Sequence, residues 1–111
     1  MKDDRLYVVH VRECIERIER YTAEGRAAFL ADTKTQDAVL RNLQTLAESL
    51  GNVSDRLKTS YPDVDWRAIT AFRNVVVHDY LGVDLEEIWH IVEHDVSDLK
   101  SKIETMWRDF R

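Results

Sequence analysis

Apolar side chains recur at steps of three and four residues along most of this chain, and this spacing constrains the fold more than any other feature. Such a spacing places the apolar side chains on one face of an α-helix. No stretch alternates with a period of two, and the 111 residues include only 3 glycines and 1 proline. The sequence therefore predicts an all-α protein. The longest apolar seam is Trp89, Val92, Val96, Leu99, Ile103, Met106 and Phe110.

The first part of the chain predicts a long helix followed by a short one. The long helix runs from about Asp4 to Tyr21, where the apolar stripe consists of Val8, Val11, Ile15 and Ile18. Gly25 marks a break, because glycine is common at points where a helix ends or turns. Residues 27–30 then predict a short helical turn that brings Phe29 into the core.

A second long helix is predicted to start near Thr35 or Gln36 and to reach Lys58. Gly51 falls inside this helix, where it could bend it. The segment Tyr61-Pro62-Asp63 then ends it, since proline cannot continue a helix interior. The apolar stripe of this helix is Val39, Leu43, Leu46, Leu50, Val53 and Leu57.

Aspartates open the last two predicted helices. Asp65 is the N-cap of a helix that ends at Gly82, and Asp84 is the N-cap of the final helix, with Glu87 placed as in a capping box. The apolar seam of the final helix fits either a helix packed along a bundle or an intermolecular coiled coil. Three heptads are short for a free-standing coil, so the bundle is preferred. We therefore expect one domain over residues 1–111, folded as an antiparallel bundle of four or five helices.

The composition narrows the cellular setting and the partners. The single cysteine, Cys14, excludes an internal disulfide. No apolar segment resembles a signal peptide or approaches the roughly 20 residues needed to span a bilayer, so we expect a cytoplasmic protein without membrane contact.

The hydrophobic core that 111 residues can form is adequate but not generous, which makes a dimer plausible. The formal net charge of −5 gives no long-range attraction to a polyanion such as RNA. A nucleic-acid function would need a local basic site, a recruited partner or weak binding.

The segment from Arg73 to Tyr80, RNVVVHDY, combines polar groups with three consecutive valines. At roughly 100° per residue, Tyr80 lies nearly in line with Arg73, whereas His78 lies roughly 140° round the helix. In a straight helix Arg73 and His78 therefore diverge. They converge only if the helix bends or unwinds near His78, which Gly82 allows, or if two copies of the segment meet across a two-fold axis.

Arg73 and His78 have the chemistry that cleavage of an RNA phosphodiester requires. Arginine grips phosphate through two N–H groups, and histidine titrates near neutral pH and can move a proton to or from a ribose hydroxyl. RNA supplies its own nucleophile, the 2′-OH, so cleavage needs a base, an acid and a positive group but no metal. The structural alternative is that Arg73 bridges to a carboxylate and His78 caps the helix C-terminus. Taken alone, the two residues favour this alternative.

Histidines elsewhere offer a metal site as a further alternative. His90 and His94 lie four residues apart and could bind a metal as a pair. No cysteine or third histidine is near them in sequence, and Glu93 and Asp95 do not follow a metalloprotease pattern. A solvated helix face is the preferred interpretation of this pair and of His10. We therefore expect no metal and no cofactor.

The motif is accompanied by related segments over most of the chain. The bare R-x4-H spacing is weakly specific, but the joined set, most specific from Val39 to Trp89, resembles HepT-type proteins of the HEPN (higher eukaryote and prokaryote nucleotide-binding) superfamily. The segments that carry the resemblance are Arg41-Asn42-Leu43 with Glu48; Pro62, Trp66-Arg67 and Ile69; Arg73-x4-His78-x-Tyr80; Leu81-Gly82-Val83-Asp84-Leu85; and Trp89.

The resemblance implies an all-α HEPN bundle that forms a homodimer. It implies a metal-independent endoribonuclease whose paired motifs form a cleft, with Arg73 and His78 as its catalytic residues and RNA as its substrate. It further implies the toxin of a toxin–antitoxin pair. The implied antitoxin is a minimal nucleotidyltransferase of the MntA type, which resembles DNA polymerase β in fold and transfers AMP onto the motif tyrosine, here Tyr80.

Two positions depart from the family pattern. Ala47 and Ser49 replace its usual glycine and alanine, and Ala47 could change how closely that helix approaches its neighbour. An alternative function is a non-catalytic HEPN subunit that binds nucleotide or substrate for a nucleotidyltransferase; the acidic net charge favours it and the intact motif disfavours it. Four residues are expected to support the cleft: Arg41, Asn42, Asn74 and Asp79. For Arg41 and Asn42, a polar contact between helices is an equal alternative.

Overall fold

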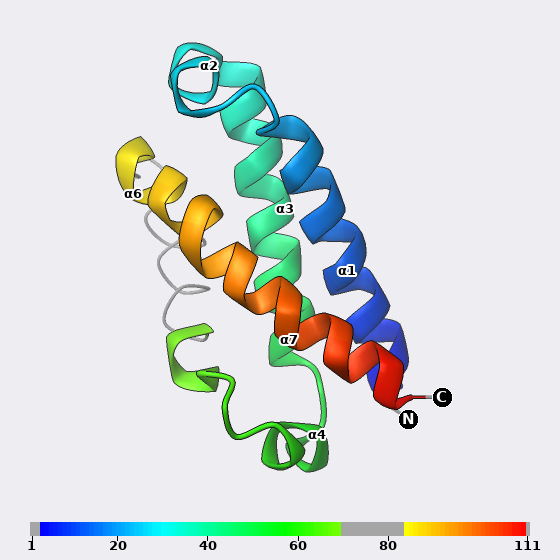
Figure 1. Ribbon diagram of the computed structural model, residues 1–111. Coiled ribbons are helices and arrows are strands. Elements are labelled where there is room, and N and C mark those ends of the chain that lie inside the picture. The colour runs from blue at the N-terminus through cyan, green and yellow to red at the C-terminus, as the bar shows by residue number, and fades with distance from the viewer. Residues whose placement is uncertain (1–2, 70–83, 111) are drawn as a thin grey trace.

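The computed structural model describes residues 3–69 and 84–110, and all regular structure in this part of the chain is helical (Figure 1). None of the described helices is long and apolar enough to cross a membrane. Residues 66–69 are also helical. The elements are α1 (Asp4–Tyr21), α2 (Arg26–Ala31), α3 (Thr33–Gly51), α4 (Asp55–Ser60), α6 (Leu85–His90), a π-helical turn (Ile91–Asp95) and α7 (Val96–Asp109).

The two long helices α1 and α3 run antiparallel and form the centre of the bundle (Figure 1). Helix α1 begins and ends where the sequence predicts, with the Asp3 side chain accepting a hydrogen bond from the Arg5 N–H at 3.0 Å. Its predicted apolar stripe is buried against α3. Each such aliphatic side chain contributes about 1.5–3 kcal/mol when fully buried. The buried stripe comprises Val8, Val11, Ile15 and Ile18, together with Cys14.

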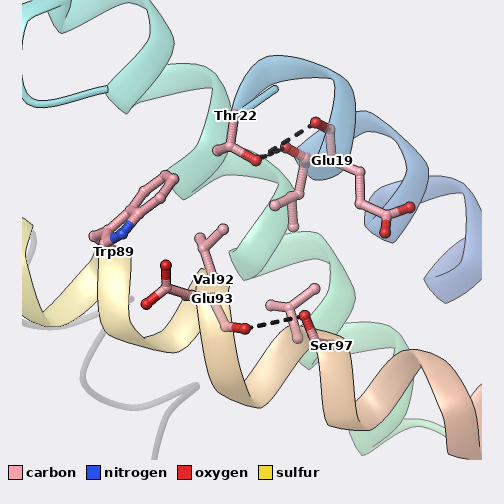
Figure 2. A pocket seen from close by; sticks show the side chains of 8 residues that line it. Glu19, Thr22, Trp89, Val92, Glu93 and Ser97 are labelled. Carbon is pink, nitrogen blue, oxygen red and sulfur yellow. Dashed lines mark hydrogen bonds between the residues drawn. The ribbon is translucent and has the colours of Figure 1, made fainter. Parts of the chain in front are cut away.

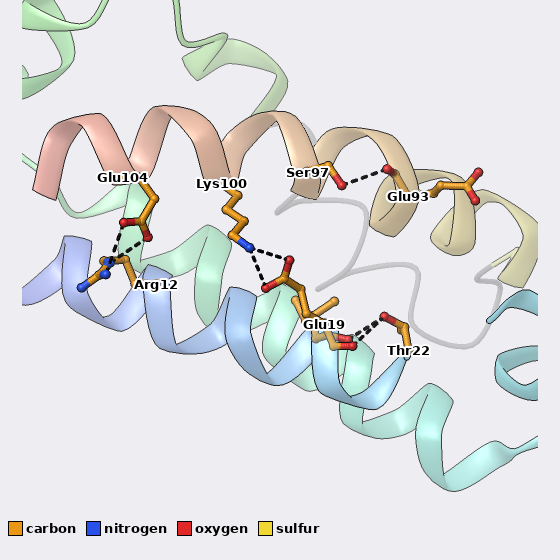
Figure 3. Close-up of polar contacts among 8 residues, drawn as sticks. Arg12, Glu19, Thr22, Glu93, Ser97, Lys100 and Glu104 are labelled. Atoms are coloured by element: carbon orange, nitrogen blue, oxygen red, sulfur yellow. Dashed lines mark hydrogen bonds and ion pairs between the residues drawn. The ribbon is translucent and has the colours of Figure 1, made fainter. Parts of the chain in front are cut away.

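Helix α7 lies across the bundle with its apolar side against the core (Figure 1). Val96, Ile103 and Met106 are buried there, and α7 packs on α1. This confirms the prediction that the C-terminal seam is used within the bundle. Two ion pairs join the exposed edges of α1 and α7 (Figure 3). The Arg12 Nε atom lies 3.0 Å from Glu104, and the Lys100 Nζ atom lies 2.9 Å from Glu19.

The short helix α2 closes one end of the bundle. Gly25 has a φ of 94°, a backbone conformation that side-chain-bearing residues rarely adopt, so the predicted break falls where glycine is needed. Phe29 is buried, as predicted. The Gln36 side chain donates to the Phe29 carbonyl at 3.0 Å, which links α2 to the start of α3.

The predicted second long helix is wrong in its extent. Helix α3 starts at Thr33 because Asp32 caps it, accepting from the Lys34 N–H at 3.1 Å. The helix then ends at Gly51 instead of bending there, and α4 begins separately at Asp55. The Ser54 side chain caps α4 at the Leu57 N–H, at 3.1 Å.

A contact distant in sequence fixes this break. The Asp4 carboxylate accepts hydrogen bonds from both the N–H and the hydroxyl of Ser54, at 2.8 and 2.6 Å. A continuous helix would use the Ser54 N–H in its own hydrogen-bond ladder, so the bond to Asp4 is incompatible with the predicted helix through this position. Helix α4 ends at Ser60, ahead of Pro62 as predicted.

The final helix is also less regular than its heptad spacing predicts. It begins after Asp84, as expected, but Ile91–Asp95 forms a π-helical turn between α6 and α7. A π turn widens the helix by one residue and changes the direction of the faces on either side. Consequently α6 packs on α2, whereas α7 packs on α1.

Candidate functional site

The central residues of the predicted site lie outside the part of the chain that the structure describes. This applies to Arg73, Asn74, His78, Asp79 and Tyr80, and to the helix end predicted at Gly82. Their proposed roles therefore stay predictions. The described residues show how the chain is held on either side of 70–83.

Both flanks of this segment begin with a capped helical turn. On the N-terminal side, the Asp65 carboxylate accepts from the Ala68 N–H at 3.0 Å. On the C-terminal side, the Asp84 carboxylate accepts from the Glu86 N–H, also at 3.0 Å. Both aspartates were predicted as N-caps, and both are confirmed.

The N-terminal flank is attached to α7. The Tyr61 hydroxyl donates to Asp109, and the Lys102 ammonium donates to the Asp63 carbonyl at 2.9 Å. The Trp66 indole N–H donates to the Tyr61 carbonyl at 3.1 Å. Burial and the neighbouring Asp109 carboxylate raise the pKa of Tyr61 to about 12, so the hydroxyl is a proton donor at neutral pH.

The C-terminal flank is attached to α2. Arg26 pairs with both carboxylate oxygens of Glu86, and its Nε atom lies 3.1 Å from Oε2. The Trp89 ring packs on Phe29 with ring centroids 5.6 Å apart. The chain before and after 70–83 is thus anchored to two different parts of the bundle.

Two of the predicted supporting residues lie on α3. Arg41 is exposed, and Asn42 is half-buried. The Asn42 side-chain amide donates to the Ala38 carbonyl of its own helix at 2.9 Å. That bond is an intrahelical one, unlike the interhelix contact considered as an alternative.

The two departures from the family pattern are accommodated in the bundle. Ala47 is completely buried and Ser49 is 7% exposed. Small side chains at these positions let α3 pack closely on its neighbours. Ala47 therefore occupies the core in place of glycine, within a helix whose main partner is α1.

His10, His90 and His94 are exposed, in agreement with the preferred interpretation of a solvated helix face. The rings of His90 and His94 lie in contact, tilted by 43° with centroids 4.4 Å apart, and the His94 Nε2 atom lies 3.3 Å from Glu93. Within residues 3–69 and 84–110, no three His, Cys, Asp or Glu side chains are placed to hold a metal ion together. His10 is exposed on α1.

A pocket that the sequence did not suggest lies between the end of α1 and the π-helical turn (Figure 2). Its volume is about 320 Å³, and it is open to solvent. Trp89 forms one wall, and the end of α1 at Thr22 lies opposite it (Figure 2). Its lining comes from α1, α6, the π-helical turn and α7, so no single sequence pattern marks it.

Comparison with known proteins places the chain in a family. The model of the family described as "Ribonuclease HepT-like" matches residues 11–106. A probable ribonuclease HepT of Thermococcus cleftensis is 37% identical over 101 residues, which cover 90% of this chain and 92% of that protein. The mRNA nuclease HepT of Shewanella oneidensis is 22% identical, over 89% of this chain and 92% of its own length. No solved structure matches the chain significantly. By the extent of the family match and the helical bundle together, the chain belongs to the HepT-like ribonuclease family.

Proposed function

We propose that this protein is a metal-independent endoribonuclease that serves as the toxin of a toxin–antitoxin pair. The observation that carries the proposal is the motif Arg73-x4-His78-x-Tyr80 within a chain that matches the HepT-like ribonuclease family over residues 11–106. One relative is named an mRNA nuclease, which supports RNA as the substrate class.

The proposed reaction uses the ribose 2′-OH as the nucleophile. His78 takes the proton from this hydroxyl, and the 2′ oxygen attacks the phosphorus while the bond to the 5′ oxygen breaks. The leaving 5′ oxygen takes a proton from a protonated motif histidine, and the products are a cyclic phosphate and a 5′-hydroxyl. Arg73 neutralises the charge that develops on the phosphate oxygens. Asn74, Asp79, Arg41 and Asn42 support the cleft.

The proposed active unit is a homodimer. In a straight helix His78 lies roughly 140° away from Arg73, so one motif alone does not converge on one phosphate. A two-fold axis brings a second copy of the same segment to the first. The cleft then has two arginines and two histidines, which gives an acidic protein a local basic site for RNA.

The proposed control is AMP transfer onto Tyr80 by a cognate MntA-like nucleotidyltransferase. Free tyrosine titrates near pH 10, so the antitoxin supplies the activated phosphate and the toxin supplies an accessible hydroxyl. The adduct places a phosphodiester charge near Arg73 and His78. It suppresses cleavage by occupying the place of the substrate phosphate.

The acidic net charge favours a second candidate function, a non-catalytic HEPN subunit that binds nucleotide or substrate for its nucleotidyltransferase. A charge of −5 opposes the long-range capture of RNA. Growth on expression separates the two functions. Wild type should arrest growth, whereas Arg73→Ala and His78→Ala should not. Arrest that survives either substitution would favour the non-catalytic subunit.

A second experiment tests the proposed control. The intact mass of wild type should rise by multiples of one AMP unit when the antitoxin is co-expressed, and the arrest should disappear. Tyr80→Phe should gain no mass at that site and should still arrest growth. An adduct mapped to Tyr7, Tyr21 or Tyr61 would overturn the assignment.

A further inference from the structure

The pocket beside the π-helical turn has a chemistry different from that of a phosphate site. Its floor is apolar, formed by Ile18, Val92 and Val96, which are 0%, 8% and 5% exposed. One wall is the ring of Trp89, whose packing on Phe29 holds it in place. The described residues that line it come from α1, α6, the π-helical turn and α7.

The polar side chains of the rim offer acceptors. The Thr22 hydroxyl donates its proton to the Ile18 carbonyl at 2.7 Å, and the Ser97 hydroxyl donates to the Glu93 carbonyl at 3.0 Å (Figures 2 and 3). With their protons committed to the main chain, both oxygens present only lone pairs. The other polar side chains among the described lining residues are the carboxylates of Glu19 and Glu93.

The two carboxylates differ in their availability. Lys100 contacts both oxygens of Glu19, at 3.1 and 2.9 Å, which neutralises that charge (Figure 3). Glu93 contacts the ring nitrogen of His94 at 3.3 Å, an ion pair only when the imidazole is protonated. Glu93 is therefore the carboxylate that can receive a cation, and it lies on the same side of the pocket as Trp89 (Figure 2).

The irregular backbone of the last helix positions the Trp89 ring and the Glu93 carboxylate. Trp89 belongs to α6, and Glu93 lies in the π-helical turn Ile91–Asp95. Turns of this kind often occur at functional sites, because the extra residue moves side chains away from their regular positions. Here the turn brings an aromatic wall, an apolar floor and a carboxylate to one opening.

We infer that this pocket receives an arginine side chain from an apolar and basic segment of a partner protein. A guanidinium stacks on an aromatic face and forms paired hydrogen bonds to a carboxylate, while its alkyl stem lies on an apolar floor. A volume of about 320 Å³ suits one or two side chains and lies at the lower end of the range for whole small-molecule ligands. Because the polar side chains of the described rim offer only acceptors, this rim disfavours a nucleotide or an RNA phosphate.

The test uses the full chain and a blocked pentapeptide with a central arginine between two leucines. Amide and indole NMR shifts are followed during the titration. Shifts should be confined to the Trp89 indole and to amides near residues 18–22 and 91–97. The same peptide with citrulline, which has the shape of arginine without its charge, should bind about fivefold more weakly, the upper end for one exposed ion pair.

A matched pair of variants tests whether the Glu93 carboxylate binds the guanidinium. Glu93→Gln should weaken the arginine peptide about fivefold. Glu87→Gln removes the same charge from an exposed position of α6 that does not line the pocket, and it should change nothing. Three results would overturn the inference: no shifts up to millimolar peptide, equal binding of the citrulline peptide, or shifts of the same resonances by AMP.

Discussion

The Tyr61 side chain links the end of α4 to the end of α7 through its hydrogen bond to Asp109. Burial and this carboxylate raise its pKa to about 12. In the unfolded chain the hydroxyl titrates near pH 10. Between the two values the folded state binds the proton that the unfolded state has released, so folding stability decreases as the pH rises.

We therefore predict a loss of stability at alkaline pH that depends on Tyr61. The contribution is fully present below about pH 10 and is lost as the pH rises through the folded value of about 12. The free energy of unfolding, measured with urea at several pH values, should decline less steeply over this range in Tyr61→Phe. Tyr21→Phe, at a residue that is 40% exposed, should follow wild type. Identical slopes for wild type and Tyr61→Phe would contradict the proposed linkage.

At the scale of elements, the junction between α3 and α4 depends on Ser54. Its hydroxyl caps α4 and also donates to Asp4 at the start of α1. Loss of a cap costs about 0.5–2 kcal/mol, and an acceptor deprived of its partner adds to this cost.

Ser54→Ala should therefore lower the free energy of unfolding by about 2 kcal/mol. Ser60→Ala is the matched control, because the Ser60 hydroxyl donates back to its own helix, at the Arg56 carbonyl, and to no other part of the described chain. The control should stay within about 0.5 kcal/mol of wild type. Chemical denaturation of the three proteins gives the values, and equal losses for both variants would show that the Ser54 contacts do not stabilise the junction.

Local signals predicted the elements well where their causes are local. Helix α1 follows from a single stripe, and the breaks at Gly25 and before Pro62 follow from backbone chemistry. The end of α3 was missed because the partner of Ser54 is Asp4, which is distant in sequence. The π-helical turn was missed because the helix segments on its two sides pack on different partners, α6 on α2 and α7 on α1. A heptad pattern describes packing on a single partner.

The same distinction applies to the candidate sites. The proposed nuclease motif is a short contiguous pattern, so the sequence alone is enough to propose Arg73, His78 and Tyr80 as its residues. The pocket at Trp89 combines residues from both ends of the chain, and each of its members has an ordinary role in its own helix. Only the packed bundle brings them together.

At the scale of the whole molecule, we predict a homodimer whose interface includes the helix carrying Arg73 to Tyr80. The reason is geometric, since one straight helix does not converge Arg73 and His78. Light scattering at micromolar concentration should give twice the mass of a single chain. A monomeric mass under these conditions would mean that a bent helix within one chain forms the site.

The central claim is that this member of the HepT-like family cleaves RNA through His78 without a metal. The most direct measurement is cleavage of RNA by the purified protein in the presence of a metal chelator. Wild type should cleave, and His78→Ala should lose about 10²–10⁴-fold in rate, as expected for a lost proton-transfer group. His94→Ala, which removes an exposed histidine of the π-helical turn, should retain activity. Circular dichroism should show all three proteins folded alike.

Two results of this measurement would contradict the account. Cleavage by His78→Ala at the wild-type rate would remove the histidine from the reaction. Cleavage that stops with the chelator and returns with a divalent metal would replace the metal-independent mechanism.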